Sequence, residues 1–196
     1  MADTGNQPHV VVFGGIGSGK TTFTDLLGEL GALVIEADVI GHEILAPEGA
    51  AFPDVAARWP EVVSGGVIDR AALGSIVFAD RAELSALEAI THPLIRAEVA
   101  RRAETSAAEV VVVELPLIGE VVGPGWTWVL IDAPADVRFE RAVARGAGAD
   151  DVRARMASQP TDDEFHAKAD WIIPNTGSLE ALAAAAEELW GTLTEE

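Results

Sequence analysis

A glycine-rich segment near the start of the chain, GGIGSGKT at residues 14–21, constrains the fold more than any other stretch. It follows an apolar run and precedes an amphipathic segment, so it is expected to connect a strand to a helix. Four of its eight residues are glycines, which allow successive main-chain N–H groups to converge on an anion beside the positive end of the helix. The pattern G-x-x-x-x-G-K-[ST] in this context predicts a P-loop, which binds the phosphates of a nucleoside triphosphate.

The residue types inside this loop predict how it would hold ATP. Gly15, Gly17 and Gly19 allow the backbone to wrap around the phosphates. Lys20 is expected to reach the β- and γ-phosphates, and the hydroxyl of Thr21 is expected to bind the Mg²⁺ that bridges them. The dinucleotide pattern G-x-G-x-x-G does not fit, because a match from Gly15 would place Lys20 at its last position. An ordinary glycine-rich turn is the remaining alternative.

The composition limits the classes of binding partner and the cellular compartment that we expect for the chain. The 196 residues include 32 acidic and 13 basic ones, giving a formal charge of −19. A broad nucleic-acid-binding surface is not expected, because such surfaces carry excess Lys and Arg. The chain has no cysteine, its first residues lack the features of a signal peptide, and no apolar run is long enough for a membrane span. We expect a cytoplasmic protein that does not bind membranes, acting as a monomer or small homo-oligomer.

Short apolar runs alternate with amphipathic segments along the chain, which predicts an α/β fold. The runs are rich in β-branched residues and read as buried parallel strands. They predict an open parallel sheet of the P-loop NTPase type, with about five strands flanked by helices. The expected strands lie at residues 9–14, 32–37, 109–115, 126–133 and 170–175.

Two intervals are too long to be simple connections between strands. Residues 39–108 read as several helices broken by prolines, Pro93 among them, and by the Gly65–Gly66 pair, and we expect a helical substrate-binding insertion there. Residues 138–168 are charged and helical in pattern, and we expect a small helical lid. The whole chain, 1–196, is predicted to be a single domain. Its core would comprise residues 8–38, 109–137 and 169–196.

Acidic residues follow two of the predicted strands. Glu36 and Asp38 close the second strand at its carboxyl end, where ligands bind in open α/β sheets. Asp38 is the candidate to orient and deprotonate an acceptor hydroxyl; the alternative is that it only caps the next helix. On a regular strand Glu36 would share a face with Asp38. Glu114, at the end of the third strand, is either a metal-associated acid or a structural carboxylate.

Three arginines in the predicted lid, Arg138, Arg141 and Arg145, are spaced i, i+3 and i+7 and therefore lie on one helical face. If they converge on polyphosphate, they neutralise charge that develops during phosphoryl transfer. The alternative is a solvated face with surface salt bridges.

Several segments together resemble the dephospho-CoA kinase family, over nearly the whole chain. The glycine loop is generic to P-loop proteins, whereas three segments in the middle of the chain are more specific. The matching stretches are GGIGSGKTT at 14–22, GALVIEAD at 31–38, IDRAALGSIVF at 68–78, AITHPLI at 89–95, ELPLIGE at 114–120 and ADWIIPNTGSLEAL at 169–182.

The resemblance implies an activity and a fold. The activity is transfer of the ATP γ-phosphate to the ribose 3′-hydroxyl of dephospho-CoA, the last step of coenzyme A synthesis, with Mg²⁺. The fold is a P-loop kinase core with a helical CoA-binding region and a lid. Functional positions of the family also map onto this chain. Residues 17–22, including Ser18 and Thr22, match the ATP loop, and Asp38 matches the acid beside the acceptor hydroxyl. Arg141 and Arg145 match arginines of the lid, and Asn175 matches a position near the adenine.

The chain also departs from the usual pattern of the family. Phe13 stands where a threonine is usual, Glu36 where an aspartate is usual, and His42 where an arginine is common. Asp162 and Phe165 stand where basic residues are usual. Loss of positive charge near an anionic substrate weakens Coulomb attraction, so these positions bear on acceptor specificity and activity.

The resulting hypothesis is a dephospho-CoA kinase with Asp38, Lys20 and Arg141 as its catalytic residues and ATP and dephospho-CoA as its substrates. Another small-molecule P-loop kinase, such as a nucleoside monophosphate kinase, is the nearer alternative. A nucleotide-binding regulatory protein that has lost the acceptor chemistry is the alternative from a different class.

Overall fold

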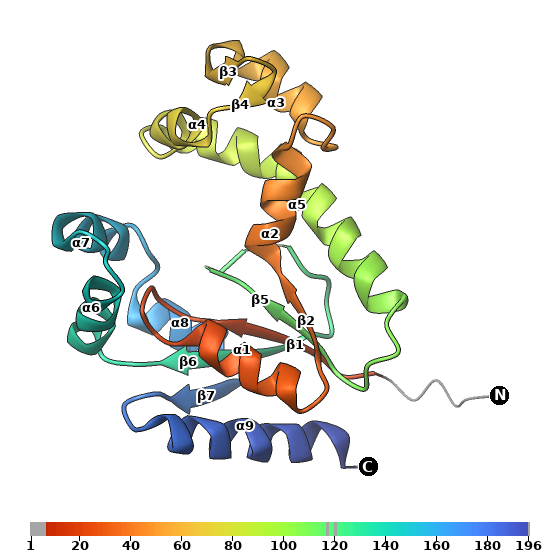
Figure 1. The fold of residues 1–196 in the computed structure, drawn as a ribbon, viewed down its shortest axis with the longest axis vertical. Coiled ribbons are helices and arrows are strands. Elements are labelled where there is room, and N and C mark those ends of the chain that lie inside the picture. Colours follow the sequence, from red (N-terminus) through yellow and green to blue (C-terminus); the bar gives the residue numbers. More distant parts are fainter. Residues whose placement is uncertain (1–6, 117, 120, 196) are drawn as a thin grey trace. The chain divides into compact units, whose positions relative to one another are not determined.

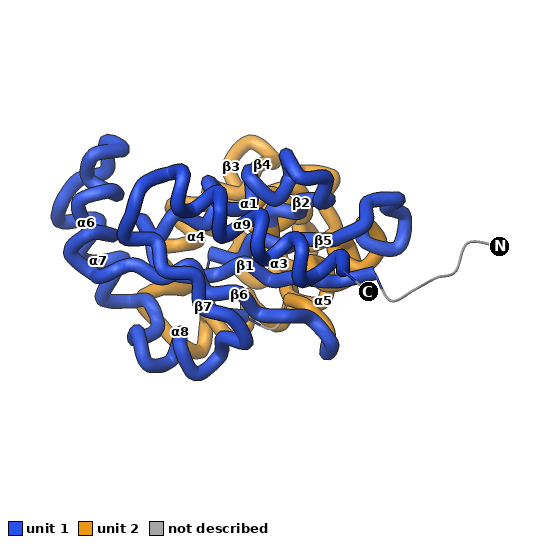
Figure 2. The backbone as a smooth tube through the Cα atoms, turned by 90° about the horizontal axis from the view of Figure 1, so that it is seen from below, with its two compact units in different colours: residues 1–36, 103–119, 124–196 blue, residues 37–102, 120–123 orange. Residues whose placement is uncertain are grey.

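The structure, a computed structural model, describes residues 7–116, 118–119 and 121–195 (Figure 1). Leu117 and Glu120, within the ELPLIGE segment, lie outside the described residues, as do the first six residues of the predicted domain. The chain divides into two compact units (Figure 2). Unit 1 comprises residues 1–36, 103–119 and 124–196, and unit 2 comprises residues 37–102 and 120–123.

Unit 1 is built on a five-stranded sheet in the order β2-β5-β1-β6-β7, and all four strand pairings are parallel. The prediction of an open parallel sheet of about five strands is confirmed. The three central runs form strands that are buried almost throughout, as in a parallel sheet covered on both faces, whereas the last run, at the edge of the sheet, is mostly exposed. The strands are β1 (His9–Phe13), β2 (Leu33–Glu36), β5 (Val111–Glu114), β6 (Thr127–Asp132) and β7 (Trp171–Pro174).

Helices cover this sheet. The helices of unit 1 are α1 (Lys20–Glu29), α6 (Ala135–Ala144), α7 (Ala149–Ala157), α8 (Asp162–Lys168) and α9 (Leu179–Thr194). On one face, Val10 and Val12 of β1 share a buried core with Leu27 of α1 and Leu189 of α9. On the other face, Phe13 packs edge-on against Trp128 with ring centroids 5.3 Å apart. Because side chains alternate along a strand, β1 thereby anchors both layers.

Unit 2 is mainly helical, as its sequence predicts, but two details differ. Its elements are α2 (Ala37–Leu45), α3 (Phe52–Arg58), the 3₁₀ turn η1 (Pro60–Val62), β3 (Val63–Ser64), β4 (Val67–Ile68), α4 (Arg70–Val77) and α5 (Arg81–Glu104), the last of which continues into unit 1. The Gly65–Gly66 pair does not break a helix: it forms the turn of an antiparallel hairpin, with φ angles of 60° and 80° that suit a two-residue β-turn.

The expected helix break at Pro93 is wrong. Helix α5 runs through this residue and has Pro93 in its interior. Proline removes one main-chain donor from a helix, and a 24-residue helix keeps its remaining hydrogen bonds on both sides. Two residues before the proline, the hydroxyl of Thr91 donates to the carbonyl of Leu87 at 2.9 Å.

The expectation that Glu36 and Asp38 share one face of a strand is also wrong. Strand β2 ends at Glu36, and helix α2 begins at Ala37 with no loop between them. Asp38 therefore lies in the first turn of a helix, where the alternation of a strand no longer applies.

In the part of the chain that the structure describes, no helix combines the length and apolar character needed to cross a membrane.

Candidate nucleotide and phosphoryl-transfer site

The loop between β1 and α1 has the backbone of a phosphate cradle. Gly17 and Gly19 have φ angles of 76° and 100°, in the left-handed region that residues with a side chain rarely adopt. Gly19 is also the N-cap of α1, so the loop ends at the positive end of that helix. The N–H of Ser18 donates to the carbonyl of Gly15 at 3.1 Å, which closes the bend. This geometry suits an anion bound by main-chain amides.

Lys20 folds back over the loop. Its Nζ donates to the carbonyl of Gly14 at 2.9 Å and to the carbonyl of Gly15 at 3.3 Å. The ammonium group is therefore held beside the bend that the glycines form. A positive charge in this place favours the phosphate groups of a nucleotide.

The first residues of α1 meet the end of β5. Thr21 Oγ1 donates to Glu114 Oε1 at 2.9 Å, and Thr24 Oγ1 donates to Glu114 Oε2 at 3.0 Å. Glu36 is the register partner of Glu114 on the neighbouring strand, so its backbone lies at the same edge of the sheet. Thr22, a third expected ligand of ATP on this helix, is partly buried.

This arrangement fits Mg²⁺. Mg²⁺ prefers oxygen ligands and is usually bound by one or two protein groups together with water and substrate phosphates. The Thr21 hydroxyl and the Glu114 carboxylate supply two such oxygens next to the loop. Over residues 7–116, 118–119 and 121–195, no group of three or more His, Cys, Asp or Glu residues is placed to hold a metal.

Asn175, after the last strand, reaches the loop. Its side-chain Nδ2 donates to the carbonyl of Ser18 at 2.7 Å, and its N–H donates to the carbonyl of Asp132 at 2.6 Å. Arg141 NH1 in turn donates to the carbonyl of Asn175 at 2.9 Å. A side chain at Gly19 would collide with the Asn175 amide. Two residues assigned by resemblance are thus brought together beside the loop.

The three lid arginines have different surroundings. Arg138 is buried, with its side chain only 8% exposed, and pairs with Asp162 at 2.6 Å. Arg141 is bound to Asn175, as described above, and Arg145 is the exposed C-cap of α6. Convergence of the set on polyphosphate stays a prediction, but a fully solvated face is wrong for Arg138.

Two further contacts with the loop were not predicted from the sequence. Gln159 lies between α7 and α8, and its Oε1 accepts a 2.9 Å hydrogen bond from the N–H of Ile16. Arg138 packs directly on Gly15 and Gly17. Both contacts join residues more than a hundred positions apart, so the local sequence pattern around each residue does not predict them.

Asp38 is exposed in the first turn of α2 and belongs to unit 2. Its approach to the loop therefore stays a prediction.

A comparison with protein families decides the class of this chain: the sequence model of dephospho-CoA kinase matches residues 9–181. The chain belongs to the dephospho-CoA kinase family. A dephospho-CoA kinase of Frankia casuarinae is 43% identical over 185 residues, which covers 92% of this chain and 81% of the relative. One of Burkholderia pseudomallei is 40% identical and covers 88% of each chain.

Solved structures agree with membership of the dephospho-CoA kinase family. A crystal structure of a Thermus thermophilus protein has a TM-score of 0.82 at 35% identity and covers 95% of this chain and 98% of its own. The dephospho-CoA kinase from Campylobacter jejuni has a TM-score of 0.67 at 28% identity, covering 95% of this chain and 97% of its own. The P-loop kinase fold expected from the sequence is therefore confirmed.

Proposed function

We propose that this chain transfers the γ-phosphate of ATP to the ribose 3′-hydroxyl of dephospho-CoA, giving CoA and ADP. The observation that carries the proposal is the P-loop with its ordered Lys20 and Thr21, in a chain that belongs to the dephospho-CoA kinase family over residues 9–181. In phosphoryl transfer the protein contributes positioning and charge stabilisation, and the loop is built for both.

The loop residues bind and orient the triphosphate. The main-chain amides of residues 17–22, together with Gly15 in the wall of the bend, surround the phosphates, and the Lys20 ammonium neutralises charge on them. The Thr21 hydroxyl and the Glu114 carboxylate would hold Mg²⁺, which would supply positive charge to stabilise the triphosphate when bound. Glu114 stays in position because Thr24 binds its second oxygen.

Asp38 is the proposed general base. Its carboxylate accepts the proton of the ribose 3′-hydroxyl as that oxygen attacks the γ-phosphorus, and the bond to the bridging oxygen of ADP breaks. Asp38 is exposed, so a substrate can reach it. Arg141 and Arg145 are proposed to move onto the transferring phosphoryl group, where guanidinium groups stabilise the charge that develops.

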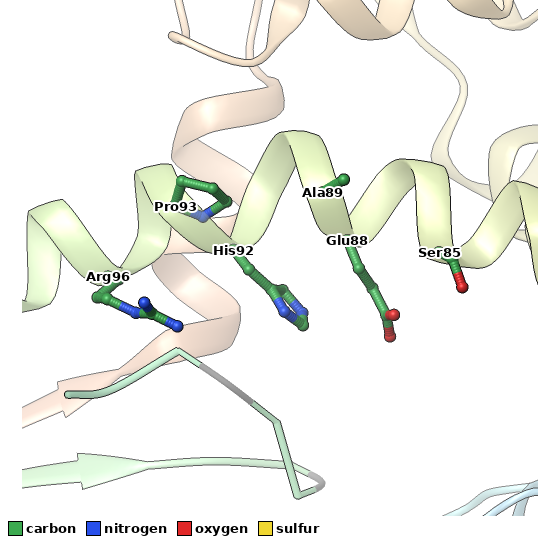
Figure 3. Close-up of a pocket in the computed structure, with 6 residues that line it drawn as sticks. All are labelled: Ser85, Glu88, Ala89, His92, Pro93 and Arg96. Carbon is green, nitrogen blue, oxygen red and sulfur yellow. The ribbon is translucent and has the colours of Figure 1, made fainter. Parts of the chain in front are cut away.

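Unit 2 is proposed to bind the acceptor. One side of α5 lines a concavity made by Ser85, Glu88, Ala89, His92, Pro93 and Arg96 (Figure 3). The side chains of Glu88, His92 and Arg96 point to the same side of the helix (Figure 3). A mixed surface that includes a guanidinium group suits a ligand carrying both phosphate and polar groups, as dephospho-CoA does.

The test is an assay of the purified protein with ATP, Mg²⁺ and dephospho-CoA, in which ADP release and CoA formation are both measured. A dephospho-CoA analogue without the ribose 3′-hydroxyl is the matched control and should give no product. A panel of nucleoside monophosphates tests the alternative kinase activity. ATP binding with no turnover of any acceptor would contradict the proposal and favour a regulatory protein.

A further inference from the structure

We propose that Arg138 is a positioning residue for ATP, whose clamped side chain forms the outer wall of the loop at residues 14–19 and fixes the shape of that loop. This inference rests on the proposed function only in taking ATP as the ligand of the loop. It concerns neither the acceptor nor the residues that touch the reacting atoms. All of the groups involved belong to unit 1.

The clamp on Arg138 has two sides. Its Nε donates to the carbonyl of Ala133, just after β6, at 2.9 Å, and its NH2 donates to Asp162 Oδ1, at the start of α8, at 2.6 Å. The Arg138 side chain is 8% exposed, whereas that of Asp162 is 55% exposed. A planar guanidinium held at two of its nitrogens has little freedom to rotate.

The segment that carries Asp162 is itself fixed to the core. Phe165 of α8 is 2% exposed, and its ring lies 6.1 Å from the ring of Phe13, the last residue of β1. Thr161 and Glu164 form a capping box at the start of the same helix. Because Phe13 directly precedes the loop, α8 and the loop are held to one point of the sheet.

The loop packs directly against this clamped arginine. A methyl group on Gly15 would collide with NH1 of Arg138, and its three nearest neighbours would all be side-chain atoms of that residue. A methyl group on Gly17 would instead collide with the main-chain carbonyl of Arg138. Gly15 has no positive φ, so the arginine rather than the backbone angle explains the need for glycine there.

Gln159 also supports the loop, next to the residues that pack against Arg138. By accepting the N–H of Ile16 at 2.9 Å, it holds the residue between the two glycines that face Arg138. The loop is thus fixed at three consecutive residues, 15–17. The main-chain N–H groups after residue 18 can then bind the phosphates. A loop fixed in its binding shape loses less conformational entropy when ATP binds.

A double-mutant cycle tests this inference. ATP affinity is measured by calorimetry without any acceptor for Gly15→Ala, Arg138→Ala and the double variant. We expect Arg138→Ala to weaken ATP binding about tenfold and Gly15→Ala to weaken it by about tenfold or more. In the Arg138→Ala background, the added effect of Gly15→Ala should fall to about twofold, because the colliding side chain is gone.

Gly17→Ala is the matched control. Its collision is with a main-chain carbonyl, and its φ of 76° is strained for alanine, so Arg138→Ala should not reduce its effect. Arg138→Gln provides a second background if Arg138→Ala does not fold, since glutamine is shorter and removes NH1. In turnover assays, the KM for ATP should rise in both Arg138 variants, while the KM for the acceptor should stay within about twofold.

The inference is overturned if Gly15→Ala has the same effect in both backgrounds, or if Arg138 variants lower the melting temperature but leave ATP affinity unchanged. Because binding is measured without an acceptor, these outcomes differ from a failure of the proposed function. If the chain phosphorylates no form of dephospho-CoA, the cycle still reports on Arg138.

Discussion

The side-chain amide of Asn175 donates a 2.7 Å hydrogen bond to the main-chain carbonyl of Ser18, which lies 157 positions earlier in the chain. This bond joins the residue after β7 to the middle of the nucleotide loop. Asn175 is only 7% exposed, so water does not readily replace it as the partner of that carbonyl.

Replacing Asn175 with alanine should therefore affect both stability and nucleotide binding. Loss of a partner for a buried carbonyl costs about 1–3 kcal/mol of the free energy of unfolding, and a loosened loop should weaken ATP binding about tenfold. Ser178→Ala is the control, because it removes the N-cap of α9 and costs about 1 kcal/mol, with no contact to the loop. Equal ATP affinities for the two variants, measured by calorimetry, would contradict this role.

Thr21→Val keeps the shape of the side chain and removes the hydroxyl next to Glu114. Turnover should then require about tenfold more free Mg²⁺ for half-maximal rate, because one protein oxygen is missing from the metal site. The control is Thr192→Val in α9, whose hydroxyl donates to the Glu188 carbonyl at 3.0 Å. An unchanged Mg²⁺ requirement in Thr21→Val would show that this hydroxyl is not a ligand.

Asp38→Asn should leave ATP binding within about twofold and lower turnover by about a hundredfold or more, because the amide cannot accept the acceptor proton. Asp54→Asn is a close control, since Asp54 is also an acidic residue in the first turn of a helix of unit 2. Both variants lose a favourable charge at a helix N-terminus. If both lower turnover equally, Asp38 acts through its helix and not as a base.

The free energy of unfolding should depend on pH in part because of the ion pairs that Glu98 makes in α5. Hydrogen bonds from Arg101 and, secondarily, Arg102 lower the pKa of Glu98 from 4.5 to about 2. A carboxyl group whose pKa is lower in the folded protein stabilises it above the unfolded pKa, and this contribution is lost as the pH falls from about 4.5 towards 2.

Glu98→Gln should therefore be less stable than the parent protein at neutral pH, and the difference should shrink below pH 4.5. Urea unfolding at a series of pH values measures it. Glu104→Gln, at the last residue of α5, controls for a general loss of negative charge. The effect should be modest because the pairs are partly exposed. A constant difference between Glu98→Gln and the parent at all pH values would argue against the shifted pKa.

The sequence predicted those features that depend on local pattern. Five apolar runs became the five strands, and the spacing of Gly14, Gly19 and Lys20 identified the loop. Such features are local because a strand needs only a few consecutive buried residues and the P-loop pattern lies within eight consecutive residues.

Features that depend on tertiary contacts were missed or misread. The helical spacing of Arg138 placed it with Arg141 and Arg145, yet the clamp by Asp162 and the Ala133 carbonyl turns Arg138 inward. The Gly65–Gly66 pair looked like a helix break, although short β-branched stretches on both sides are also typical of a hairpin. Pro93 was misread because a long helix tolerates one missing donor.

The supports of the loop have a consequence for synthesis of the protein. A ribosome makes residues 14–19 long before Arg138, Gln159 and Asn175, which contact them in the folded protein. A nascent chain released before residue 138 would carry the complete glycine motif without any of these three groups. Competence to bind nucleotide should therefore arise only after residue 175 has been made, so that ATP stabilises chains that include these groups and not shorter fragments.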